Sequence, residues 1–132
     1  MKLRTAVAAV LLACTVAACG SSGPAPRPLT SAKLVIVSPT PNQVTGPAVT
    51  LQFQVIGGTV LPPAQVTGPL RGDQGHIHVS LDGKLVQMAY SSQAQLTGLT
   101  PGPHSVQASW VAVDHQPFQN RVVAAVLFTV SG

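Results

Sequence analysis

Apolar and polar residues alternate with a period of two along several short stretches of this 132-residue chain. The clearest stretches are residues 49–55, 77–81, 106–112 and 122–130. A period of two is typical of β-strands that bury one face and expose the other. The chain beyond residue 32 shows no segment with the period of an amphipathic helix. The pattern therefore predicts an all-β domain over residues 33–132.

The segments between these stretches are rich in residues that form turns. Asp82-Gly83 is a strong signal for a two-residue hairpin. Thr100-Pro101-Gly102-Pro103 is a second turn, and residues 57–75 form a long connection rich in Gly and Pro. About seven short strands separated by such turns indicate an antiparallel β-sandwich.

Two motifs resemble parts of bacterial immunoglobulin-like and fibronectin-III-like modules. Val37-Ser38-Pro39 resembles the end of their first strand, and residues 99–106 resemble the corner that begins their sixth strand. The resemblance implies an immunoglobulin-like sandwich in which the strand starting at Gly75 pairs antiparallel with the strand starting near His104. The chain lacks the Cys…Trp…Cys signature of antibody domains.

The first twenty residues have the three parts of a secretory signal. A basic start precedes an apolar run over residues 5–18, and small residues follow. The ending Val16-Ala17-Ala18-Cys19-Gly20 resembles the lipobox of bacterial lipoproteins. The resemblance implies that residues 1–18 are removed and that Cys19 carries lipid, as in small actinobacterial envelope lipoproteins. An ordinary signal peptide with a chance cysteine is the alternative.

The segment after the cysteine separates the expected lipid from the expected domain. Residues 19–32 are rich in Gly, Ser and Pro and have little apolar surface to bury. Such a composition is typical of a flexible tether. We therefore expect an extracytoplasmic protein that is held to the cell membrane through lipid on Cys19.

The charged residues argue against nucleic acid as a partner and against catalysis. Beyond residue 18 the chain has five Lys and Arg, three Asp and no Glu, so its net charge is only +2. The basic residues do not cluster as they would on a nucleic-acid surface. No pair of carboxylates is available for acid–base chemistry, and no cysteine remains as a nucleophile. The sequence therefore predicts a protein that is not an enzyme.

Three of the four histidines are expected to converge. His76 and His78 stand two residues apart on a strand and so share a face, opposite the core residue Ile77. His115 comes just after the strand that pairs with the strand of His76 and His78. If the chain stays extended up to residue 115, the His115 side chain points outward like those of His76 and His78. Three histidines with Asp114 nearby would suit zinc or copper. The alternative is three surface imidazoles without a ligand.

Other residues of interest are given structural roles. His104 has the parity of the core residue Trp110 and stands at the corner where the resembled modules often use Tyr or His to hydrogen-bond the backbone. Continuing the hairpin register from Asp82-Gly83 pairs Ile77 with Met88, which predicts that Met88 faces the core. A thioether beside the histidines, which copper-carrying envelope domains typically have, is then missing.

The leading functional hypothesis is a non-catalytic, lipid-anchored module that binds or presents an envelope protein or a glycan. Its loops 57–75 and 113–121 would form the binding end, where Phe118 is either exposed to a partner or folded over the sandwich. The alternative hypothesis is binding of divalent copper or zinc by His76, His78 and His115. A purely structural envelope component is the third.

Overall fold

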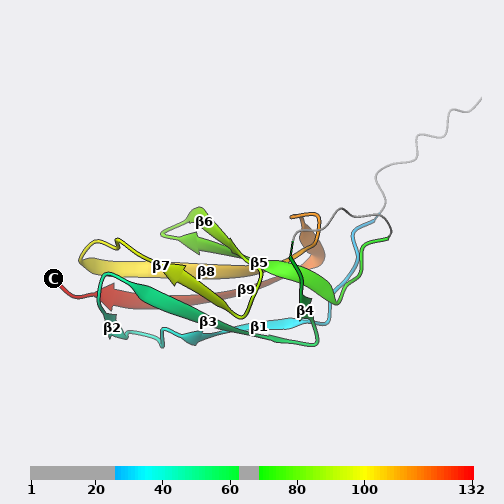
Figure 1. Ribbon diagram of the computed structural model, residues 1–132. Helices are drawn as coiled ribbons and strands as arrows, with labels where there is room; N and C mark the ends of the chain where they lie inside the picture. Colours follow the sequence, from blue (N-terminus) through cyan, green and yellow to red (C-terminus); the bar gives the residue numbers. More distant parts are fainter. Residues whose placement is uncertain (1–25, 63–68) are drawn as a thin grey trace, which may run out of the picture.

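The computed structural model describes residues 26–62 and 69–132. Two sheets face each other across a core (Figure 1). The smaller sheet has the order β1-β3-β7 and consists of β1 (Lys33–Ser38), β3 (Val49–Ile56) and β7 (Gln93–Leu96). The expected signal peptide and the lipidated Cys19 lie outside the described residues.

The larger sheet carries most of the chain after residue 70. Its order is β2-β9-β8-β5-β4, and β6 also pairs with β5. These strands are β2 (Val44–Thr45), β4 (Thr59–Val60), β5 (Gln74–Leu81), β6 (Lys84–Ala89), β8 (Gly102–Ala112) and β9 (Pro117–Val130). The all-β sandwich is therefore confirmed, and residues 26–62 and 69–132 contain two strands of only two residues, β2 and β4, beside seven longer ones. In the described part of the chain no helix has the length and apolar character that a membrane crossing requires.

Alternation of burial along the strands follows the alternation of the sequence. Strand β3, for example, buries Val49, Leu51 and Phe53 and exposes the polar residues between them. The inner faces of both sheets meet in one apolar cluster, and Trp110 lies within it. Phe118 stacks on Trp110, with the ring centroids 6.2 Å apart, and is buried. Phe118 is thus a core residue and is not exposed to a partner.

The ordered domain begins earlier than the sequence suggested. Residues 27–32, expected in the flexible tether, lie against strand β9. Asn120 accepts a hydrogen bond from the Thr30 amide at 2.9 Å and donates one to the Thr30 carbonyl at 2.7 Å. The side chains of Thr30 and Ala32 are buried. The expectation of a free tether up to residue 32 is wrong for this part, because its backbone finds partners on β9.

The β5–β6 hairpin departs from the expected register. Asp82 and Gly83 both have positive φ, and Leu81 pairs with Lys84 as predicted. An irregularity between Val79 and Ser80 then shifts the pairing by one residue. Met88 consequently pairs with His78 instead of Ile77 and is 38 % exposed. The prediction that Met88 faces the core is wrong, because one extra residue in a strand moves every later side chain to the other face.

Candidate metal centre

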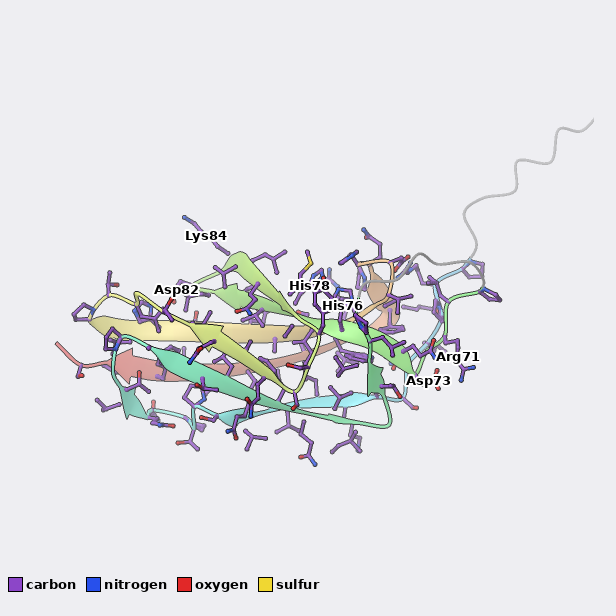
Figure 2. All side chains as sticks on the ribbon, viewed as in Figure 1. Arg71, Asp73, His76, His78, Asp82 and Lys84 are labelled. Atoms are coloured by element: carbon purple, nitrogen blue, oxygen red, sulfur yellow. The ribbon has the colours of Figure 1, made fainter. Side chains whose placement is uncertain are left out.

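Strand β5 places two histidines on the outer face of the larger sheet. His76 pairs with Val111 and His78 pairs with Ser109 of the antiparallel neighbour β8. Figure 2 shows the two histidines close together on β5, away from the end of the strand that leads to Asp82. The two-residue spacing on a strand thus gives one shared face, as expected.

The third histidine is brought to the same place by a turn. Strand β8 ends at Ala112, whose carbonyl accepts a hydrogen bond from the His115 amide at 2.9 Å. The Ala112 amide donates to the Gln116 carbonyl at 3.0 Å, which closes the turn. His115 has φ of 66°, a conformation uncommon outside glycine. The expectation that His115 arrives by continued extension is therefore wrong, although its place beside β5 is as predicted.

The ring nitrogens of the three histidines converge around one atom, Nε2 of His76. That atom lies 3.2 Å from Nε2 of His78 and 3.0 Å from Nδ1 of His115. The three candidate ligand atoms are all within 4.8 Å of one another. Three nitrogens held tetrahedrally at ordinary zinc–nitrogen distances lie about 3.3 Å apart. Two of the three separations are thus close to those of a metal site before any ligand moves.

His76 is fully buried, which the sequence did not lead us to expect. The rings of His78, Tyr90 and His115 surround it, with centroid distances of 5.0, 5.1 and 4.5 Å. It lies on the outer face of the sheet, as predicted, but the turn after β8 and the end of β6 cover it. Burial, and then the neighbouring His115 and His78, lower the pKa of His76 to about 4. At neutral pH its imidazole is therefore neutral, the form that binds metals.

No arrangement of protons satisfies the whole cluster. An imidazole nitrogen offers either one proton or one lone pair, and Nε2 of His76 faces two other nitrogens. Its Nδ1 atom is buried and has no hydrogen-bond partner. A metal held by Nε2 would leave a proton on Nδ1 that still has no acceptor, so the observation that points to a metal is the contact of three ring nitrogens and not the unpaired Nδ1. A metal ion accepts lone pairs from all three rings at once, which hydrogen bonding alone cannot achieve.

Asp114 lies beside the cluster but belongs to a different set of contacts. Both of its carboxylate oxygens accept hydrogen bonds from Arg27, and the ligand group consists of the three histidines without it. Arg27 also donates to the carbonyls of Gln116 and Pro117 at 2.9 and 3.0 Å. The hydrogen bonds from Arg27 lower the pKa of Asp114. Arg27 thereby fastens the turn that carries His115.

No pattern in the sequence indicates this role of Arg27. It stands in the Gly- and Pro-rich segment, 87 residues before Asp114, and long-range pairs of this kind leave no local pattern. We expect an Arg27→Ala variant to lose up to about tenfold in zinc affinity, because a partner bonded directly to a ligand typically contributes 10–100-fold and Arg27 acts on the turn of His115 rather than on its ring. A competition titration with a zinc indicator measures this loss. Arg71→Ala, which removes an exposed pair with Asp73, is the control, and equal affinities of the two variants would contradict the role.

A groove of about 230 Å³ adjoins the cluster. His78 and His115 line it together with Ser80, Leu85, Ser109 and Arg121. Two of the three candidate ligands are therefore reached from solvent, whereas His76 forms the buried base. A molecule in the groove would therefore contact His78 and His115 directly.

The fourth histidine lies at the other end of the sheet. Nε2 of His104 donates to the Thr100 carbonyl at 2.8 Å, and Nδ1 lies 2.7 Å from a carboxylate oxygen of Asp82. The Thr100 carbonyl, and then Asp82, raise the pKa of His104. Asp82 also accepts a hydrogen bond from the Ser105 amide at 2.8 Å. His104 thus joins the turn at residue 100 to the β5–β6 hairpin and lies outside the cluster.

Comparison with known proteins supports the fold. No family model and no curated protein matches the chain. Fibronectin(III)-like modules of Clostridium thermocellum CbhA align with a TM-score of 0.53 and 16 % identity, over 74 % of this chain and 94 % of theirs. A Jonesia denitrificans lytic polysaccharide monooxygenase aligns with a TM-score of 0.45 and 18 % identity, over 70 % of this chain and 60 % of its own. The likeness to the CbhA modules shows a fibronectin-III-like sandwich.

Proposed function

We propose that this protein binds one transition-metal ion, copper or zinc, through His76, His78 and His115. The observation that carries the proposal is the convergence of two imidazole nitrogens, from His78 and His115, on the buried Nε2 of His76. Histidine is the commonest metal ligand in proteins, and imidazole suits both zinc and copper. The depressed pKa of His76 supports the proposal, because no proton has to leave this ring at neutral pH.

We propose further that the domain works outside the cytoplasm, held to the membrane by lipid on Cys19. The basic start, the apolar run and the lipobox-like ending support this anchoring. The groove beside the cluster supports a role in binding or presentation, because a partner seated there would contact His78 and His115, two of the proposed ligands. An envelope protein or a glycan remains the proposed partner.

The test is a count of bound ions per chain. The full chain carries Cys14→Ser and Cys19→Ser, so that no thiol binds metal, and is purified without a polyhistidine tag. Equilibrium dialysis against zinc, followed by elemental analysis, is expected to give one ion per chain. A His78→Ala/His115→Ala variant is expected to retain none, since it removes two of three ligands but leaves the buried His76 in place.

The matched control is His104→Gln, which removes a histidine outside the cluster and keeps a donor for the Thr100 carbonyl. It is expected to bind one ion like the parent chain. Equal binding by the parent and by the variant that lacks His78 and His115 would overturn the proposal.

A further inference from the structure

A thioether lies beside the histidine cluster, on the same face of the sheet. Met88 is the cross-strand partner of His78, whereas its neighbour Ala89 is buried opposite Ile77. Directly paired residues in antiparallel strands have Cβ atoms about 4.5–5.5 Å apart. The side chain of Met88 therefore starts next to a candidate ligand and, with its three rotatable bonds, is able to move toward it.

Tyr90 keeps the Met88 sulfur near the cluster. Its hydroxyl donates a hydrogen bond to Sδ of Met88 at 3.4 Å. The Tyr90 ring also contacts His76, with a centroid distance of 5.1 Å. The sulfur and the buried histidine thus share one neighbour. This contact holds the thioether on the histidine side of β6.

The donor atoms around the cluster are imidazole nitrogens and a thioether, with no carboxylate or thiolate among the described residues. Each of the three aspartates is engaged elsewhere: Asp73 with Arg71, Asp82 with His104 and Asp114 with Arg27. Thioether ligands favour copper(I), whereas zinc sites in proteins are built from His, Cys and carboxylates. The combination of three imidazoles and one methionine matches copper(I) better than zinc.

We propose that the site is a copper site in which Met88 is the fourth ligand and binds copper(I) through Sδ. This inference rests on the proposed metal-binding function of the histidine cluster. The thioether makes the site selective: it strengthens the binding of copper(I) and adds nothing to the binding of zinc. The tyrosine hydroxyl holds the sulfur while no ion is bound and releases it when the ion arrives.

The test compares the parent chain with Met88→Leu, both in the Cys14→Ser/Cys19→Ser background. Leucine has a similar volume, and residue 88 is partly exposed, so the variant retains the fold. Copper(I) affinity is measured without oxygen against a chromogenic copper(I) chelator, and zinc affinity against a zinc indicator. Met88→Leu is expected to lower copper(I) affinity at least tenfold and to leave zinc affinity unchanged.

A positional control returns the thioether to a distant site on the same sheet. Leu127 is exposed and pairs with Ser105, so Leu127→Met added to Met88→Leu supplies a methionine far from the cluster. This double variant is expected to bind copper(I) as weakly as Met88→Leu alone. X-ray absorption at the copper edge is expected to show a sulfur ligand only in the parent chain.

The outcomes separate this inference from the proposal on which it rests. Unchanged copper(I) affinity in Met88→Leu, with ions still bound through the histidines, would overturn the role of Met88 and keep the metal site. An equal loss of zinc and copper affinity would do the same, because it would indicate a structural effect. Absence of binding of either ion by the parent chain would overturn both.

Discussion

Addition of zinc is expected to raise the melting temperature of this protein by roughly 10 °C when the free ion is at 100 times its dissociation constant. Binding to the folded state alone contributes about 2.7 kcal/mol under that condition. Each kcal/mol shifts the transition of a domain of about 100 residues by roughly 4 °C or more. Differential scanning calorimetry of the chain without cysteines measures the shift, and addition of a chelator is expected to reverse it.

The control for this experiment must separate loss of a ligand from loss of packing. His76 is fully buried, so replacing it would destabilise the protein with or without metal. His78 and His115 are partly exposed, and the His78→Ala/His115→Ala variant removes ligands at a smaller cost to the core. Its melting temperature is expected to be the same with and without zinc. A full shift in this variant would show that the ion acts elsewhere on the chain.

The longer strands were predictable because they depend on local patterns, and the pairing of β5 with β8 was predictable from the resemblance to immunoglobulin-like modules. Alternation of apolar and polar residues marks a buried face wherever a strand lies on a core, and Asp82-Gly83 fixes the start of the hairpin. The antiparallel pairing of β5 with β8 then brings His115 to His76 and His78. The confirmed β-sandwich and the approach of the three histidines therefore both follow from short-range signals combined with one resemblance.

The features that sequence reasoning missed depend on single irregularities or long-range contacts. The shift in pairing register between Val79 and Ser80 moves Met88 to the histidine face. Neither a turn motif nor the composition of the strand indicates this shift. The prediction assumed a regular register beyond that point, and it therefore placed Met88 on the core face instead of the histidine face. The burial of His76 was missed for a similar reason, since it depends on Tyr90 and His115 folding over the outer face of the sheet.

A second class of missed contact joins the expected tether to the metal cluster. Arg27 stands in a segment whose composition indicates disorder, yet it holds the turn of His115 through Asp114. Composition indicates how much apolar surface a segment has to bury. It does not indicate which hydrogen bonds the segment forms with residues that are distant in the sequence. The segment that connects the domain to the proposed lipid anchor therefore also holds the turn that carries His115, one of the proposed ligands.

Replacement of Gly75 by alanine is expected to destabilise the domain by about 2–3 kcal/mol, the upper range for overpacking in a filled core. A Cβ atom at this position would lie 2.1 Å from the Val111 carbonyl oxygen and 3.0 Å from the Trp110 ring. The oxygen belongs to the backbone of the paired strand β8, so relief requires the two strands to separate. Urea unfolding followed by the fluorescence of Trp110 measures the change.

The same substitution should also weaken metal binding, because Gly75 precedes His76 and lies opposite Ala112 at the base of the His115 turn. Separation of β5 from β8 at this point moves two candidate ligands away from the third. Gly46→Ala is the matched control, since a Cβ atom there meets nothing within 4 Å. The control is expected to keep both its stability and its zinc affinity. A Gly75→Ala variant that unfolds like the control and binds zinc equally well would show that close strand packing at residue 75 does not position the histidines.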